Sequence, residues 1–262
     1  SVLIEPIAQM IVRPDEPLAG QLPNEDAQSL VFDDSSLFDW DKFSGYDRIE
    51  GGTRANVGFR YAAELGAIAT VSGVVGQSYQ IAGLNSFAVQ DLTETGTVSG
   101  LEDDVSDYVG SATIDSGRGY FLTARGRFDS ATFDVNQAQV TATGKMGDVT
   151  ASASYLYLRE QPAIASTNSG TPTDTISGRA SWQFTETWRL FGSIAWDFAE
   201  KQMAGNSIGL AYDDECTTFS IAYSEITQDY TDLQTSKSLI VSLQLRTLGG
   251  TQFQSNFSDG SN

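Results

Sequence analysis

Side chains that could carry out chemistry are scarce in this chain of 262 residues, which contains one cysteine and no histidine. The absence of histidine excludes Ser-His-Asp hydrolysis, Cys-His nucleophilic chemistry and histidine-ligated metal sites. Neighbouring carboxylates such as Asp213 and Asp214 could suggest acid–base catalysis, but an acidic protein has many such pairs. The sequence contains no nucleophile elbow, phosphate-binding loop or dinucleotide fingerprint. We therefore expect neither an enzyme nor a bound cofactor.

The charge balance excludes a second class of function. Lysine and arginine together number 15, against 34 aspartate and glutamate residues, so the formal charge is −19. A chain with this charge repels phosphate backbones. We expect no nucleic-acid partner.

Two long segments hold much of the negative charge. Residues 14–52 carry ten carboxylates against Lys42 and Arg48, and residues 91–107 carry six. Carboxylate oxygens suit Ca²⁺ or Mg²⁺, but the spacing is not that of an EF-hand loop, so solvated surface loops are the favoured interpretation. The first segment also contains large apolar side chains, which predict a loop that folds back onto another part of the protein. These are Leu30, Phe32, Leu37, Phe38, Trp40 and Phe43.

Apolar and polar residues alternate with a period of two along most of the chain, as in β-strands. In the run 53–62, for example, Val57 and Phe59 alternate with Arg54 and Arg60. No run of about 18 uncharged apolar residues predicts a transmembrane helix, but a strand of a membrane barrel needs only about 10 residues. Twelve strands are predicted, at 3–13, 53–62, 66–80, 107–115, 119–128, 132–143, 149–159, 174–184, 188–198, 205–213, 216–226 and 237–248.

The connections between these strands alternate in length. Every second connection is a short turn. The connections between these turns include the four long loops, 14–52, 81–106, 160–173 and 227–236. Long outer loops and tight periplasmic turns are typical of outer-membrane barrels, and aromatic residues such as Trp182 and Trp188 flank a short turn as a girdle would. We predict an all-β antiparallel transmembrane barrel whose chain starts and ends in the periplasm. A water-soluble β-sandwich or solenoid is the alternative.

Arginines recur on the polar face of the predicted strands. On the inside of a barrel they would tune what passes or binds in the lumen. They could equally keep the interior wet and pair with loop carboxylates, and the sequence leaves both interpretations open. The six arginines are Arg54, Arg60, Arg125, Arg127, Arg179 and Arg246.

The single cysteine, Cys216, follows a predicted periplasmic turn at 213–215. The periplasm is oxidising and permits disulfides, but this chain offers no second cysteine. Cys216 is therefore either a free thiol or the partner of a cysteine elsewhere in a longer protein. The chain starts at Ser1 without a leader, so we expect that a signal peptide has been removed or that the chain is an internal piece.

Five strings of residues carry a more specific signal. They are PNED at 23–26, FDDSSLF at 32–38, GYDRIEGG at 45–52, YDDEC at 212–216 and SLQLRTLGG at 242–250. In this order they resemble the lipopolysaccharide-assembly family LptD, also called organic solvent tolerance proteins. The resemblance spans nearly the whole chain.

The resemblance implies a fold and a role. The family has a barrel of 26 strands behind a periplasmic jelly-roll domain, so residues 1–262 would be the C-terminal part of that barrel, with 14–52 and 81–106 as extracellular or lumenal loops. The family inserts lipopolysaccharide into the outer leaflet of the Gram-negative outer membrane through a wide lumen and a lateral seam between its first and last strands. The last predicted strand, with Leu239, Val241, Leu243 and Leu245, would form one lip of this seam.

The resemblance also implies partners. These are lipopolysaccharide, the surrounding outer-membrane lipid, a plug lipoprotein like LptE in the lumen, and a periplasmic lipopolysaccharide-transport bridge reached through the N-terminal domain. The family links its periplasmic domain to the barrel by disulfides, often from adjacent cysteines. Cys216 lies between Glu215 and Thr217, so this turn permits one bond only.

Two other classes of function compete with this interpretation. A self-contained twelve-stranded porin for small solutes would pair strand 3–13 with strand 237–248. A soluble β-rich binding protein would bury Val57, Phe59, Val241 and Leu243 in a core that excludes water.

Overall fold

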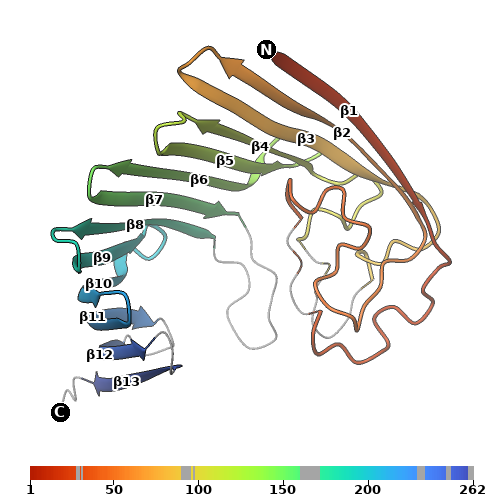
Figure 1. The fold of residues 1–262 in the computed structure, drawn as a ribbon. Helices are drawn as coiled ribbons and strands as arrows, with labels where there is room; N and C mark the ends of the chain where they lie inside the picture. The colour runs from red at the N-terminus through yellow and green to blue at the C-terminus, as the bar shows by residue number, and fades with distance from the viewer. Residues whose placement is uncertain are drawn as a thin grey trace. The chain divides into compact units, whose positions relative to one another are not determined.

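The computed structural model describes residues 1–27, 30, 32–89, 96, 98–159, 172–228, 234–245 and 249–258. These residues form thirteen strands, which follow one another in the sheet in chain order (Figure 1). Pairing is antiparallel from the first to the fourth strand and from the eighth to the thirteenth. The strands are β1 (Val2–Val12), β2 (Thr53–Leu65), β3 (Ala69–Ala82), β4 (Tyr108–Asp115), β5 (Tyr120–Phe128), β6 (Val135–Met146), β7 (Val149–Leu158), β8 (Thr173–Gln183), β9 (Trp188–Asp197), β10 (Gln202–Asp213), β11 (Thr217–Gln228), β12 (Gln234–Leu245) and β13 (Gly249–Ser258).

The predicted all-β class is confirmed, and each of the twelve predicted strands has a counterpart. Within the described residues, no helix is long and apolar enough to cross a membrane. The two long loops at the beginning of the chain occupy 13–52 and 83–107, within two residues of the predicted bounds. The predicted loop 160–173 falls almost wholly outside the described residues, as does the middle of 227–236.

The structure has one strand more than the twelve predicted, because β13 follows β12. Its ten residues pair with β12 over their whole length, from Leu245↔Gly249 to Ser236↔Ser258. Thirteen is an odd number of strands, which contradicts the expectation that the chain starts and ends on the same side. Because β11 and β13 occupy both edges of β12, strand 237–248 cannot pair with strand 3–13 as the porin hypothesis required.

The strands have two chemically different faces, since successive side chains point to opposite sides of a sheet. On β2, Arg54 is 1% exposed, whereas the outward-turned Phe59 is 55% exposed. Val57 and Leu243 are exposed as well. The soluble hypothesis needed these apolar side chains in a water-excluded core, and the described structure does not provide one for them.

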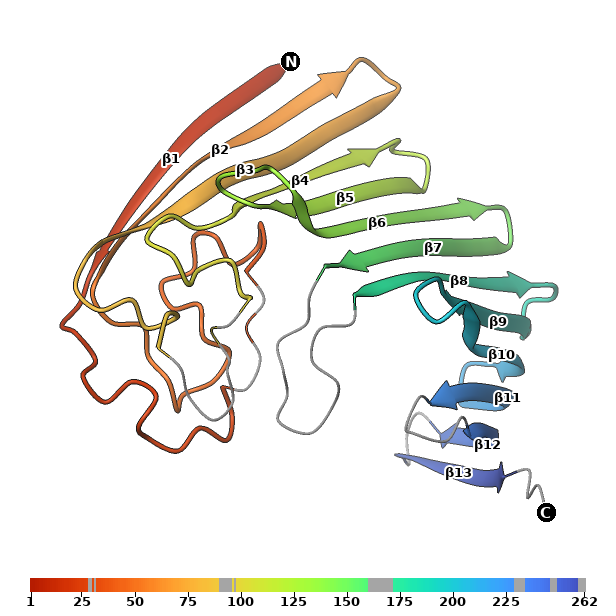
Figure 2. The same ribbon diagram turned by 180° about the vertical axis from the view of Figure 1, so that it is seen from behind.

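The chain divides into two compact units. The first comprises 1–117, 122–140 and 156–173, and the second comprises 118–121, 141–155 and 174–262. In the first unit the long loops gather beside β1–β4, as both ribbon views show (Figure 2). Its buried apolar side chains come mostly from these loops, so the core of this unit lies between loop and sheet.

Candidate functional site

The two long loops of the first unit form one folded body, called here the loop cap and made of the described residues of 13–52 and 83–107. Their apolar side chains share a core with Val109 of β4, and Phe38 and Val74 pack against it. This confirms the prediction that the acidic loop folds back onto the protein. The buried members of the core are Ala27, Leu30, Phe32, Leu37, Phe43, Phe87, Leu101 and Val109.

Two glycines make room for the loop cap on the strands. Gly58 of β2 and Gly76 of β3 stand opposite each other in the register. A Cβ atom on Gly76 would lie 2.6 Å from Leu37 Cδ2, and one on Gly58 would lie 3.2 Å from Phe38 Cζ. The absence of side chains at this pair therefore lets the loop pack directly onto the backbone of the sheet.

Substitution of Gly76 by alanine is expected to loosen the loop cap. The new methyl group would meet Leu37 and the carbonyl oxygen of Val57, and overpacking of this kind costs about 1–3 kcal/mol. Protease cleavage within 13–52 should become roughly 10-fold faster. Gly178→Ala is the control, because its Cβ would meet nothing closer than 3.7 Å. Equal cleavage rates for the two variants would contradict this role of Gly76.

A buried ion pair joins the loop cap to β2. Glu50 and Arg54 are 2% and 1% exposed and contact each other through Oε1 and Nε. Arg13 adds a second cation, with its Nη1 3.8 Å from Glu50 Oε2. The remaining donors of Arg54 reach Ser78 Oγ at 3.3 Å and Asn85 Oδ1 at 3.2 Å. One carboxylate thus neutralises cations from both the loop and the strand.

Lys42 lies buried beside this pair. Its Nζ is 3.5 Å from the Asp39 carbonyl oxygen and 3.5 Å from Asn56 Oδ1. Burial lowers the pKa of Lys42 from 10.5 to about 8, although Glu50 opposes the shift. The Lys42 ammonium therefore stays charged at neutral pH, and its burial lowers the stability of the loop cap.

Lys42→Met is expected to stabilise the loop cap at pH 7, by about 3 kcal/mol at most. The opened loop binds the Lys42 proton more tightly than the closed loop, so stability of the unsubstituted protein should rise between pH 8 and 10.5. The variant lacks this rise, and its advantage should vanish towards pH 10.5. The check is the ratio of cleavage rates of the two proteins by subtilisin at each pH. A ratio that does not change with pH would refute the cost assigned to Lys42.

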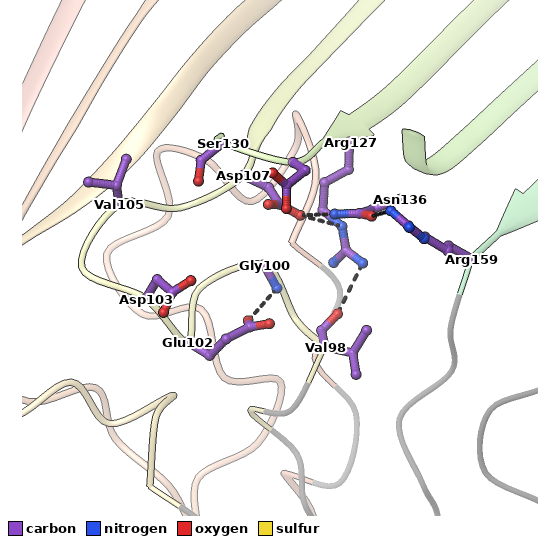
Figure 3. Close-up of a pocket in the computed structure, with 11 residues that line it drawn as sticks. Val98, Gly100, Glu102, Asp103, Val105, Asp107, Arg127, Ser130, Asn136 and Arg159 are labelled. Atoms are coloured by element: carbon purple, nitrogen blue, oxygen red, sulfur yellow. Dashed lines mark hydrogen bonds and ion pairs between the residues drawn. The ribbon is translucent and has the colours of Figure 1, made fainter. Parts of the chain in front are cut away.

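A polar pocket of about 240 Å³ lies where the second loop meets β5 and β6 (Figure 3). Arg127 Nε is 3.3 Å from Asp107 Oδ2, and Arg127 Nη2 donates to the Val98 carbonyl oxygen at 3.0 Å. Asn136 Nδ2 donates to the same Asp107 oxygen at 2.9 Å. Burial raises the pKa of Asp107, and Asn136 and Arg127 oppose this shift. Because Arg127 and Asp107 satisfy each other, the pocket anchors the loop to the strands.

The acidic residues of the loop cap do not converge on a metal site. In the part of the chain that the structure describes, no group of three acidic or cysteine side chains is placed to hold an ion. Asp91 and Glu94 of the second acidic segment lie outside the described residues. Some of the carboxylates serve the loop itself; Asp26, for example, accepts the backbone N–H groups of Tyr46 and Asp47 at 2.9 and 3.0 Å.

The six arginines predicted on the inner face differ in their partners. Four of them, all in the first unit, pair with carboxylates: Arg54 with Glu50, Arg60 with Glu5 at 3.2 Å, Arg125 with Asp33 and Asp34 at 3.9 and 3.6 Å, and Arg127 with Asp107. Three of the four arginines pair with carboxylates of the loop cap. This agrees with the interpretation in which the arginines pair with loop carboxylates. Arg179 has no ion-pair partner among the described residues, and Arg246 lies outside them.

The residues predicted to form the seam lie on a strand that has a neighbour on each side. Leu239, Val241, Leu243 and Leu245 share one face of β12, opposite Tyr223, Ile221, Phe219 and Thr217 of β11. At this end of the described sheet the outermost strand is β13, with the exposed Phe253 on it.

Cys216 is exposed in the turn between β10 and β11. Asp214 Oδ1 accepts the backbone N–H groups of Cys216 at 2.9 Å and of Thr217 at 2.7 Å. The turn is thereby fixed by its own aspartate, and the thiol is left at the surface.

Comparison with known proteins decides the family. The family model described as LPS transport system D, LptD, matches residues 1–188 and 163–257. The chain belongs to the LptD family. An LPS-assembly protein LptD from Cupriavidus necator is 25% identical over 218 residues, which are 80% of this chain and 26% of that protein.

Further LptD proteins show the same relation. The protein from Chromobacterium violaceum is 26% identical over 246 residues, 86% of this chain and 28% of its own length. That from Saccharophagus degradans is 27% identical over 208 residues, 75% of this chain and 23% of its own length. The chain thus spans about a quarter of the curated LptD proteins it matches. The family resemblance seen in the sequence is confirmed, and LptD is by its description a transport family.

Proposed function

We propose that the protein containing this chain inserts lipopolysaccharide into the outer leaflet of the Gram-negative outer membrane, with these strands as part of its barrel wall. The observation that carries the proposal is membership in the LptD family. The two-faced strands support it. Lipopolysaccharide has sugars at one end and acyl chains at the other, and a wall with a polar and an apolar face matches both ends. The role is transport, and no chemical step is assigned.

If β13 is the last strand of the full-length barrel, a lateral seam would lie at the edge of β13. An exit between strands needs an edge that is weakly paired, and both edges of β12 are occupied. Leu239, Val241, Leu243 and Leu245 then line the apolar surface one strand away from the seam. Their proposed role changes from the lip of the exit to the lipid-facing wall beside it.

The proposed partners follow from the same role. A plug lipoprotein like LptE would occupy the lumen, and a periplasmic bridge would deliver lipopolysaccharide through an upstream domain. The exposed position of Cys216 supports a disulfide to that domain. Non-reducing and reducing gels of outer membranes, followed by mass spectrometry of linked peptides, test this bond. A thiol at Cys216 that stays free in the full-length protein would exclude it.

Depletion of the full-length protein in its own cells tests the main proposal. Newly made lipopolysaccharide should then fail to reach the surface, where an impermeant reagent labels its sugars in a pulse–chase experiment. Uptake of small solutes should not change before surface lipopolysaccharide falls. Normal export combined with an early loss of solute uptake would overturn the proposal and favour a porin.

A further inference from the structure

The second unit contains a large cavity. It has a volume of about 740 Å³ and is lined by residues of β6 to β11. Two arginines line it, Arg179 of β8 and Arg189 of β9, together with hydroxyl side chains. We call it the arginine groove. The hydroxyl side chains that matter here are Ser177, Ser181, Ser193 and Ser207.

The arginines of the groove differ from those of the first unit in having no counter-ion. Neither Arg179 nor Arg189 is within ion-pair distance of a carboxylate among the described residues, although the chain has 34 acidic residues against 15 basic ones. Arg189 lies over the ring of Phe191, 5.4 Å from its centre. Within the described residues, two positive charges in one cavity therefore have no carboxylate partner.

Glu225 is the carboxylate among the described residues that line the groove, and it is already engaged. Glu225 accepts hydrogen bonds from Tyr223 Oη at 2.6 Å and from Asn206 Nδ2 at 3.1 Å. It also faces Lys237 in the register of β11 and β12. Glu225 is thus held by its own neighbours and not by the arginines of the groove.

Strand geometry separates the two guanidinium groups. Arg189 pairs with Gln183, which lies four residues after Arg179 on β8, so the two arginines share a face. Four residues along a strand and one strand across correspond to roughly 14 Å between their Cα atoms. Ser181 and Phe191 lie opposite each other between them, and Ser193 and Ser207 are joined by a hydrogen bond of 2.8 Å.

We propose that the arginine groove binds the phosphate groups of an anionic lipid headgroup as the lipid passes along the wall. A guanidinium group donates two parallel N–H bonds to phosphate oxygens, and serine hydroxyls can donate to phosphate or sugar oxygens. The inference rests on the proposed function and adds a location and a chemistry to it. The phosphates could belong to the sugar headgroup of lipopolysaccharide or to a phospholipid.

Photocrosslinking in cells tests the groove in the full-length protein. The probe is p-benzoylphenylalanine in place of Phe191, and a second probe replaces Thr113 on the inner face of β4. Lipopolysaccharide should crosslink to the Phe191 probe, and Arg179→Gln with Arg189→Gln should lower the yield about 10-fold or more. Arg60→Gln and Arg125→Gln are the matched controls, because these arginines already have carboxylate partners.

The outcomes separate the groove from the wider proposal. Two outcomes would contradict lipid binding in the groove without contradicting the proposed function. One is crosslinking of lipopolysaccharide at Thr113 but not at Phe191. The other is a crosslinking yield at Phe191 that is unchanged when both arginines are replaced. Crosslinks of lipopolysaccharide at neither probe would count against the proposed function itself. The variant with Arg179→Lys and Arg189→Lys keeps both positive charges, so it should retain part of the crosslinking yield. Retained yield in this variant would show that the loss in the Gln variant does not come from misfolding.

Binding by the purified full-length protein distinguishes the two sources of phosphate. Native mass spectrometry would compare bisphosphorylated lipid A, lipid A without phosphates and phosphatidylglycerol. The groove predicts retention of bisphosphorylated lipid A that depends on Arg179 and Arg189 and weakens with salt. Equal retention of lipid A without phosphates would contradict phosphate binding in the groove. If only the retention of phosphatidylglycerol depends on the arginines, the groove binds phospholipid.

Discussion

Glu50→Gln is expected to open the loop cap, at a cost of about 3–5 kcal/mol. The substitution removes the carboxylate charge that pairs with both Arg54 and Arg13 in a site where Arg54 is 1% exposed, and a buried charge without its partner is strongly destabilising. Cleavage by protease within 13–52 of the membrane-embedded full-length protein should accelerate at least about 100-fold. The strands should resist the protease as before.

Glu5→Gln is the matched control for this result. Glu5 pairs with Arg60 at 3.2 Å, but the two side chains are 51% and 60% exposed. An exposed pair of this kind contributes at most about 1 kcal/mol. If Glu50→Gln and Glu5→Gln had equally small effects, the ion pair at Glu50 would not hold the loop cap.

Phe32→Ala is expected to destabilise the loop cap by about 3–5 kcal/mol through a different mechanism. Phe32 is fully buried in the apolar core of the loop, and removal of a buried phenyl ring leaves a cavity. Hydrogen exchange of amides in 32–52 should accelerate by two orders of magnitude or more, about the factor that this free energy gives. Amides of β2 and β3 should exchange with smaller changes.

Tyr46→Ala controls for the loss of an aromatic residue from the same loop. Tyr46 is 94% exposed, so its removal leaves no cavity and should change exchange by less than about twofold. If Phe32→Ala also left exchange unchanged, the apolar core would not stabilise the loop.

The strands could be predicted because each has one polar face and one apolar face, which gives the sequence a period of two. β13 shows the limit of this signal. In the segment GGTQFQSNFS only two phenylalanines stand out, and two glycines precede them. Its pairing is satisfied by backbone bonds to β12, which a side-chain pattern does not report.

The loop cap could be predicted to fold, but its contacts could not. The apolar residues of 14–52 signalled a core, because a disordered acidic loop would not carry them. The partners of that core, Phe87 and Leu101, come from a different loop, and no local pattern joins the two. The same holds for Asn85 and Ser78, which complete the hydrogen bonds of Arg54 from two further segments.

The arginines show a similar division. Alternation placed them together on one face, but charge alone could not say which would find carboxylates. Which arginines pair with carboxylates depends on where the loop packs. The loop packs on β2 and β3 because Gly58 and Gly76 leave space there. These glycines were a readable signal, since two glycines in the interiors of neighbouring strands often mark the close approach of another segment.

The arrangement of the loop cap also has a consequence for the order of assembly. Its apolar core is built from two loops that flank a single hairpin, β2 and β3, and it is complete at Val109. Contacts between neighbouring segments form early, because little chain entropy is lost in closing them. This section of wall can therefore acquire its finished loop cap while later strands are still being added. A growing barrel would then carry a closed loop cap before its circumference is complete.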